Sequence, residues 1–250
     1  MNGKDLEKEL LWEAPHIAKE APAEREEASA FCEGYKAFLN AGKTERECVK
    51  AAVELLEKAG YREFDPKASY KAGDKVYWNN RKKALAAATF GTLGMEEGLR
   101  MNGAHIDSPR LDIKQNPLYE DSDFALLDTH YYGGIKKYQW VTLPLALHGV
   151  IAKKDGTIVP VSIGDEEEDP VFVITDLLVH LASKQLEKKG SVVVEGEKLD
   201  LLIGSRPLEQ DPSLDQEEKE AVKANVMELL KKYYDMEEED FLSAELEIVP

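Results

Sequence analysis

The spacing of apolar residues changes near residue 60, and this change limits the folds that the chain can adopt. Within residues 27–41 and 44–60, apolar side chains recur every three or four positions, as they do along one face of a helix. Thr44 followed three residues later by Glu47 is the capping-box pattern that begins a helix, and Gly60 suits its end. The first part of the chain therefore predicts two consecutive helices.

Beyond residue 60 the apolar residues come in short runs separated by polar or glycine-containing turns, which is typical of strands. Helices followed by strands indicate a mixed α/β unit. Past Pro109 short strands and turns predominate, so we expect a separate, mainly β region there. The predicted strands are residues 75–78, 85–90, 98–106, 140–152, 157–163, 191–195 and 245–249. Further helices are predicted over residues 174–189 and 215–234, with a short one and an irregular arm within residues 1–26.

The charge balance disfavours two classes of partner. The 49 acidic and 32 basic side chains give a net charge of -17, which repels nucleic-acid phosphates and anionic lipid surfaces. The sequence has no run of about 18 apolar residues, and its N-terminus lacks the apolar core of a signal peptide. Only two cysteines are present, which disfavours a disulfide framework. We therefore expect a cytoplasmic protein that binds neither nucleic acid nor a membrane.

The segment from Asn102 to Pro109 contains the residues most suited to catalysis. In the predicted strand, His105 and Asp107 are two positions apart, and side chains at that spacing point to the same side of an extended backbone. A zinc-binding imidazole needs an acceptor on its second ring nitrogen, and a neighbouring aspartate fixes its tautomer and orientation. The pair is thus a candidate metal ligand with its orienting carboxylate. Taken alone, the spacing also fits a hydrogen-bonded structural pair.

Other polar residues have simpler explanations. His130 and His148 flank a glycine-containing segment and could line a pocket, but packing or surface roles explain them better. The acidic run over residues 165–169 is followed by a proline and is typical of a solvated loop.

Four segments match motifs of one known family. These are residues 77–81, Tyr-Trp-Asn-Asn-Arg; 105–109, His-Ile-Asp-Ser-Pro; 132–134, Tyr-Gly-Gly; and 174–181, which end in His-Leu. Trp140 and Gly149 follow the third segment at matching distances. In this combination, over about residues 27–250, the chain resembles the aspartyl-aminopeptidase-type family of zinc aminopeptidases.

Two departures from the family pattern indicate a divergent, bacterial-type branch. Ile135 stands where the family has a third glycine, and Thr142-Leu143 stands where an acidic-basic pair is usual. Both lie near the substrate pocket that the family builds. The family's preference for acidic N-terminal residues is therefore not carried over to this chain.

The resemblance implies an α/β fold in which a phosphorylase/hydrolase-like catalytic domain carries an inserted, β-rich dimerisation domain. Residues 1–112 would form the N-terminal part of the catalytic domain, and residues 113–250 the dimerisation domain. It further implies a metallo-aminopeptidase that removes N-terminal residues from peptides with two zinc ions per active site. His105 would bind zinc, Asp107 would be the catalytic residue that orients it, and His180 would contact substrate in a neighbouring subunit. Such enzymes assemble as homo-oligomers built from dimers.

Only the first part of that metal site is recognisable in the sequence. The family's bridging aspartate, catalytic glutamates, later aspartate ligand and last histidine follow the inserted domain, and no segment of this chain matches them. We therefore expect the chain to be an N-terminal portion of the enzyme. Two alternatives stay open: a non-catalytic assembly module derived from the family, and a carboxypeptidase or deacylase of the same fold.

Overall fold

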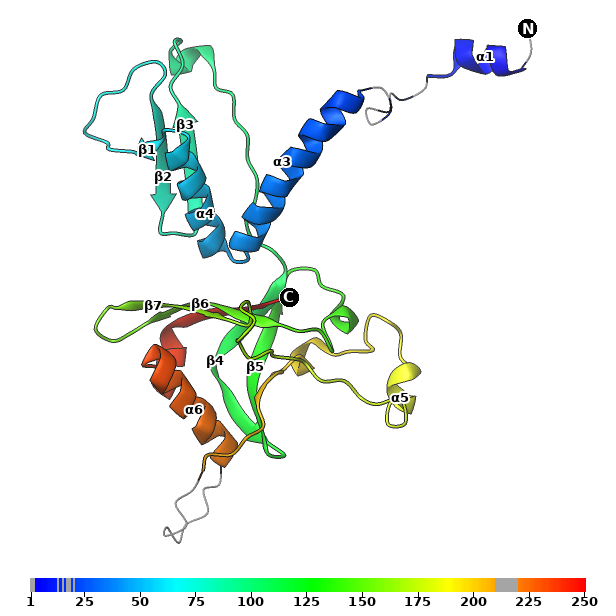
Figure 1. Cartoon of the computed structure of the whole chain (residues 1–250), viewed down its shortest axis with the longest axis vertical. Helices are drawn as coiled ribbons and strands as arrows, with labels where there is room; N and C mark the ends of the chain where they lie inside the picture. The colour runs from blue at the N-terminus through cyan, green and yellow to red at the C-terminus, as the bar shows by residue number, and fades with distance from the viewer. Residues whose placement is uncertain (1–2, 13, 15, 17–18, 20, 210–219) are drawn as a thin grey trace.

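The computed structural model describes residues 3–12, 14, 16, 19, 21–209 and 220–250. The predicted N-terminal helix is α1 (Gly3–Leu10), and α3 (Pro22–Ala41) projects away from the two sheets, with α1 beyond its outer end (Figure 1). α3 begins before residue 27 because proline is tolerated in the first turn of a helix. Although α3 has 20 residues, neither it nor any other helix in the described part of the chain is apolar enough to cross a membrane.

The second predicted helix is α4 (Glu45–Lys58), and it begins as its capping box predicts. The Thr44 hydroxyl accepts a hydrogen bond from the Glu47 backbone N–H at 3.3 Å. In return, the Glu47 carboxylate accepts from the Thr44 N–H at 3.1 Å. Two backbone donors that have no partner within the helix are thereby satisfied.

A small sheet follows α4. It consists of β1 (Arg62–Glu63), β2 (Lys75–Asn80) and β3 (Ala84–Thr89), with β1 parallel and β3 antiparallel to β2. The last two are the strands predicted over residues 75–78 and 85–90. α4 contacts this sheet, and the Tyr77 hydroxyl donates to the Glu57 carboxylate at 2.7 Å. The first part of the chain is therefore the mixed α/β unit that the sequence indicates.

The strand predicted over residues 98–106 does not form in the described chain. A short 3-10 helix, η1 (Met95–Glu97), is followed by irregular backbone as far as Pro109. A strand needs a neighbour for its backbone hydrogen bonds, and no described strand pairs with this segment. Its apolar side chains are unburied, with Leu99 and Met101 65% and 82% exposed. The prediction is wrong here because an apolar run becomes a strand only beside a partner.

A six-stranded sheet is the main element of the second part of the chain. Its strands are β4 (Arg110–Asp121), β5 (Phe124–Tyr132), β6 (Ala146–Ala152), β7 (Ile158–Ile163), β8 (Leu201–Gly204) and β9 (Ala244–Val249). They lie in the order β7-β6-β9-β4-β5-β8, and each neighbouring pair is antiparallel. β7 and β9 confirm the strands predicted over residues 157–163 and 245–249. Of the strand predicted over 140–152 only the part from Ala146 forms, because η2 (Lys137–Gln139) and a turn precede it.

The hydrophobic core lies between this sheet and α6 (Ala221–Tyr234), which covers one face together with η4 (Glu238–Ser243) (Figure 1). α6 confirms the predicted helix from residue 221 onward, and residues 215–219 of that prediction lie outside the described residues. Burial of each large side chain contributes about 1.5–3 kcal/mol relative to exposure. The core therefore fixes β4 and β9. Its most buried members include Leu111, Leu127, Ile151, Leu201, Val222 and Ile248.

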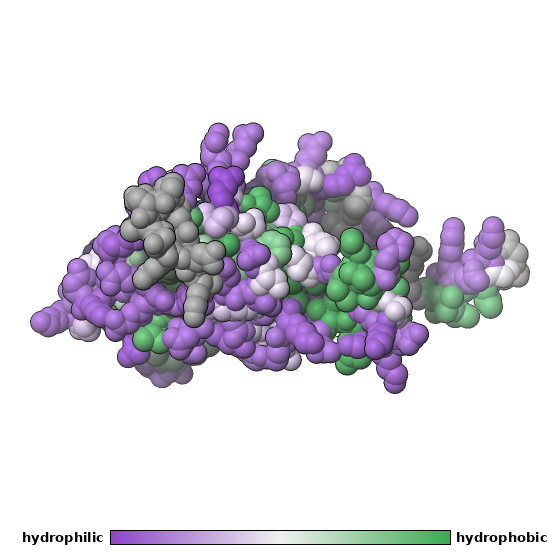
Figure 2. Space-filling model, turned by 90° about the horizontal axis from the view of Figure 1, so that it is seen from below, coloured by the Kyte–Doolittle hydropathy of each residue, from purple (hydrophilic) through white to green (hydrophobic). Residues whose placement is uncertain are grey.

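Two predicted elements between β7 and α6 are largely wrong. The helix predicted over residues 174–189 is reduced to α5 (Ser183–Leu186), and the residues of the strand predicted over 191–195 form turns before η3 (Gly196–Lys198). A short helix is marginal in water unless a neighbour covers its apolar face. Here Leu177, Leu178, Val179 and Leu181 are 55%, 71%, 67% and 70% exposed. Seen from below, apolar side chains gather toward the right of the molecule, on the side where α5 lies (Figures 1 and 2).

Candidate functional site

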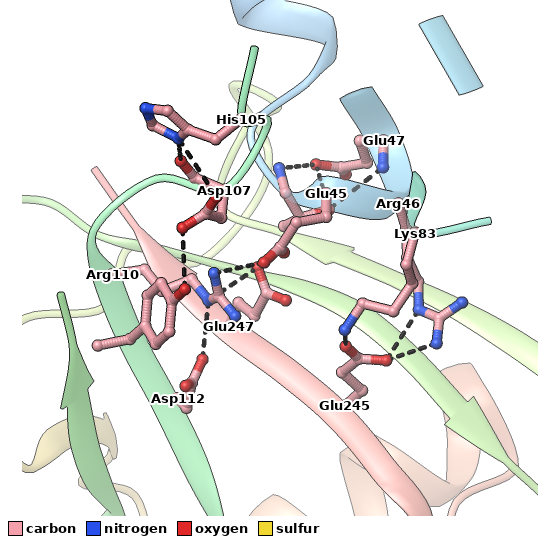
Figure 3. Close-up of polar contacts among 12 residues, drawn as sticks. Glu45, Arg46, Glu47, Lys83, His105, Asp107, Arg110, Asp112, Glu245 and Glu247 are labelled. Atoms are coloured by element: carbon pink, nitrogen blue, oxygen red, sulfur yellow. Dashed lines mark hydrogen bonds and ion pairs between the residues drawn. The ribbon is translucent and has the colours of Figure 1, made fainter. Parts of the chain in front are cut away.

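His105 and Asp107 lie together in the irregular segment that leads into β4. The His105 Nδ1 is 2.9 Å from the Asp107 carbonyl oxygen and 3.2 Å from its Oδ1. Figure 3 shows the other ring nitrogen of His105 pointing away from Asp107, and the histidine side chain is 83% exposed. Irregular backbone, not strand alternation, brings the two side chains together. An imidazole held through Nδ1 presents Nε2 to an incoming ligand.

Tyr132, at the end of β5, holds the other side of the same carboxylate. Its hydroxyl donates to the Asp107 Oδ2 at 2.8 Å. This hydrogen bond, together with a backbone N–H and the neighbouring His105, holds the pKa of Asp107 below its ordinary value. The same carboxylate raises the pKa of Tyr132. Asp107 is therefore an ionised acceptor with a separate partner on each oxygen.

Arg110 lies beneath this pair and is surrounded by carboxylates. Its guanidinium carbon is 4.3 Å from the centre of the Tyr132 ring. Nη1 donates to Glu45 and Nε donates to Asp112, both at 2.8 Å, and Nε is 3.2 Å from Glu247. The arginine side chain is 9% exposed. These contacts join α4, β4 and β9 around one buried cation (Figure 3).

Glu247 is the unusual acid of this cluster. Burial and the nearby negative charge of Glu45 raise the pKa of Glu247 to about 8, against the opposing effect of Arg110. The Oε2 atoms of Glu45 and Glu247 are buried without a hydrogen-bond partner in the described part of the structure. Two carboxylates this close compete for one arginine. Burial and Glu45 thus favour the protonated form of Glu247, whereas Arg110 favours the ionised form.

A neighbouring set of contacts joins the two sheets. Glu245 on β9 accepts a hydrogen bond from Arg46 Nε at 2.9 Å and forms an ion pair with Lys83. These three residues come from α4, from the turn between β2 and β3, and from the six-stranded sheet. The small sheet and the large one are thus tied at the same place where the Arg110 cluster lies (Figure 3).

His148 on β6 has a structural role. It is 2% exposed, and its Nδ1 is hydrogen-bonded to Glu47 at 2.8 Å. Its Nε2 is 3.3 Å from Asp165, close enough for an ion pair but out of hydrogen-bond alignment. Burial pushes the pKa of Glu47 up, but the contacts with His148 outweigh it and hold that pKa below its ordinary value. Residues 165–169 form a largely exposed loop, as expected, and within it Asp165 pairs also with Lys43.

His180 and His130 take no part in the contacts that surround His105 and Arg110 in the described structure. His180 is exposed in the turn before α5, and it takes no part in the hydrogen bonds and ion pairs found within the described ranges. The structure therefore does not bring it to His105 and Asp107 within this chain. His130 lies on the surface, 3.1 Å from Glu197, with its ring stacked on Tyr131.

The donor set at His105 fits part of a zinc site. A neutral imidazole with its Nδ1–H held by a carboxylate is a common zinc ligand arrangement. Zinc sites in proteins take three or four protein ligands. Across residues 3–209 and 220–250, apart from the few N-terminal positions that are not described, no group of three or more His, Cys, Asp or Glu side chains is placed to hold a metal ion.

Sequence comparison relates the chain to one peptidase family. Residues 38–250 match the family described as aminopeptidase I zinc metalloprotease (M18). The protein named "Probable M18 family aminopeptidase 1" of Clostridium acetobutylicum is 58% identical over 228 residues, which cover 90% of this chain and 48% of that protein. Its namesake from Thermotoga maritima is 46% identical over 226 residues, with the same coverage of 90% and 48%. The chain spans about half the length of the curated relatives that it matches.

Solved structures show the same similarity. The crystal structure of the M18-family aminopeptidase from Thermotoga maritima has a TM-score of 0.87 and 44% sequence identity, and the match covers 96% of this chain and 51% of that one. Aminopeptidase I from Clostridium acetobutylicum has a TM-score of 0.76 and 57% identity, covering 87% of this chain and 48% of its own. The mixed α/β fold described above is thus shared with these structures.

Proposed function

The chain belongs to the aminopeptidase I (M18) family of zinc metalloproteases, and on that premise we propose that the natural protein removes N-terminal residues from peptides. The observation that carries the proposal is the contact between His105 and Asp107, which leaves one imidazole nitrogen available to a metal. Because the chain covers 48% of its relatives, the activity is assigned to the whole natural protein.

His105 would supply one zinc ligand, and Asp107 would hold the imidazole through Nδ1. Bound zinc supplies a Lewis acid that polarises a peptide carbonyl and lowers the pKa of water. A site with two zinc ions needs several more donors than His105. We infer that these come from the half of the relatives' length that this chain does not span, because the described residues offer no further cluster.

We further propose that residues 1–112 are the first part of the catalytic domain and residues 113–250 an inserted dimerisation domain. The division lies close to the gap between the two sheets, since the small sheet ends at Thr89 and the large one begins with β4 at Arg110, three residues before the boundary. An interface between copies would cover the exposed apolar side chains of Leu177, Leu178, Val179 and Leu181. His180 lies within this apolar segment and would approach the partner's active site. We therefore propose that the natural protein is a homo-oligomer built from dimers.

The proposed location is the cytoplasm. Cys32 and Cys48 are both free thiols, and Cys32 is exposed. Free, exposed thiols persist in a reducing compartment. This observation supports the location independently of the family.

The test is zinc content together with release of N-terminal residues, measured on the natural protein in full length. His105→Ala should lose zinc and most of the activity. His130→Ala is the matched control, because that histidine is exposed and pairs only with surface groups; it should resemble wild type. A His105→Ala protein with normal zinc content and activity contradicts the proposal. A wild-type protein without zinc or activity favours the non-catalytic assembly module.

A further inference from the structure

Tyr132 joins the exposed His105–Asp107 pair to the buried Arg110 cluster. We propose that Tyr132 is a positioning residue of the zinc site, which fixes the Asp107 carboxylate so that His105 keeps the orientation needed to bind metal. The proposal rests on the proposed function, since it gives His105 its role as a zinc ligand. It adds a residue that acts through Asp107 and does not itself touch the metal.

The two oxygens of the Asp107 carboxylate have different partners. Its Oδ1 is 3.2 Å from the His105 Nδ1, and its Oδ2 accepts the Tyr132 hydrogen bond at 2.8 Å. The aspartate side chain is 39% exposed, so water competes for both oxygens. A carboxylate with only one protein partner can rotate about its Cβ–Cγ bond. The second bond, from Tyr132, selects the rotation that keeps Oδ1 facing the histidine.

The Tyr132 ring is itself held in place by its cross-strand neighbour. Tyr132 and Arg110 are directly opposite each other in the register of β5 and β4. Cross-strand partners of this kind lie within contact of each other, and here the guanidinium lies over the aromatic ring at 4.3 Å. A cation over the face of a tyrosine ring is attractive. The phenol is therefore held by sheet register and by a cation on its face.

Arg110 is held in turn by its acidic neighbours. Its guanidinium is 9% exposed and is held by three carboxylates from three elements, namely Glu45, Asp112 and Glu247. The planar fork of arginine suits several acceptors at once. The buried cluster thus fixes Arg110, Arg110 fixes the Tyr132 ring, and the Tyr132 hydroxyl fixes the carboxylate of Asp107 at the surface. The Tyr132 hydroxyl, although 39% of the residue is exposed, points at Asp107.

The experiment measures zinc affinity on the metal-free natural protein in full length, by competition with a chromophoric chelator. Tyr132→Phe removes the hydroxyl and keeps the ring over Arg110. Loss of a group that orients a metal ligand directly costs about 10- to 100-fold in affinity. Tyr132 acts one hydrogen bond further out, through Asp107, so we expect a zinc site that is severalfold weaker, up to about 10-fold. Tyr131→Phe is the matched control, because this neighbour makes no hydroxyl hydrogen bond with Asp107; its zinc affinity should equal that of wild type.

A double-mutant cycle separates positioning through Asp107 from a general loss of structure. In an Asp107→Asn background, Tyr132→Phe should have little further effect on zinc affinity, because the carboxylate that it orients is gone. The unfolding midpoint of Tyr132→Phe should stay close to that of Tyr131→Phe. Wild-type zinc affinity in Tyr132→Phe, or an undiminished effect in the Asp107→Asn background, overturns the inference.

Failure of the inference is distinguishable from failure of the proposed function. If His105→Ala loses zinc while Tyr132→Phe binds it as tightly as wild type, only the role of Tyr132 is wrong. If His105→Ala binds zinc as wild type does, the metal site itself is misplaced, and the role of Tyr132 fails with it.

Discussion

The carbonyl oxygen of Glu245 on β9 occupies the place where a side chain at Gly149 on β6 would begin. Gly149 also has a φ of +143°, a backbone conformation that residues with a Cβ rarely adopt. Both features let β6 and β9 approach closely in the middle of the six-stranded sheet. The side-chain carboxylate of the same residue, Glu245, contacts Arg46 and Lys83.

Gly149→Ala should therefore destabilise the protein by about 3 kcal/mol or more, because the backbone of one strand must shift. Urea unfolding measures the change. Gly190→Ala is the control, since a Cβ there meets nothing within 4 Å; its effect should stay within about 0.5 kcal/mol. Equal unfolding free energies for the two variants would show that the β6–β9 approach is not tight.

The capping box of α4 gives a second prediction. Thr44→Ala removes the hydroxyl that accepts from the Glu47 N–H, and loss of such a cap costs about 1 kcal/mol of unfolding free energy. Thr44→Ser keeps the hydroxyl and should restore most of that loss. Thermal unfolding of the three proteins checks this order. A serine variant as unstable as the alanine variant would assign the effect to the lost methyl group instead.

The pKa of Glu247 predicts how stability depends on pH. In the unfolded chain this carboxyl titrates near its ordinary value of 4.5, and in the folded protein near 8. Between these values the folded state holds a proton that the unfolded state has released, so the unfolding free energy falls as pH rises. We expect a decrease on the order of 1–3 kcal/mol across this window from Glu247.

Glu247→Gln mimics the protonated form and should remove that part of the decrease. Urea unfolding at about pH 5 and about pH 8.5 measures it in both proteins. Glu54→Gln, at an exposed position of α4, is the control and should keep the wild-type slope. If Glu247→Gln retains the wild-type slope as well, the proton resides elsewhere in the cluster.

Local signals in the sequence predict elements that need no distant partner. The capping box at Thr44 and the apolar spacing behind it are complete within one helix, and α4 forms as predicted. Residues 98–106 and 174–189 fail for the opposite reason. Their apolar patterns require a neighbouring strand or surface, and their side chains are exposed in the described chain. Pattern alone does not say which neighbour supplies the burial.

In the candidate site, too, contacts between residues close in the sequence could be predicted, and contacts between distant residues could not. His105 and Asp107 are two residues apart, and their contact could be anticipated from spacing, although irregular backbone and not a strand creates it. The Arg110 cluster could not be anticipated, because Glu45 and Glu247 are about two hundred positions apart in the sequence and meet only through the fold. Within the alternating residues 245–249, Glu247 reads as a solvent-facing position, yet α4 covers it and it is 3% exposed. The role of His180 stays a prediction.

The central claim is that His105 binds zinc through Nε2 while Asp107 holds Nδ1. Anomalous diffraction at the zinc absorption edge, from crystals of the natural protein in full length, tests it most directly. The account predicts an anomalous peak about 2.0–2.1 Å from the His105 Nε2, with Nδ1 still facing Asp107. A zinc peak elsewhere with His105 unliganded, or zinc bound through Nδ1, would contradict it.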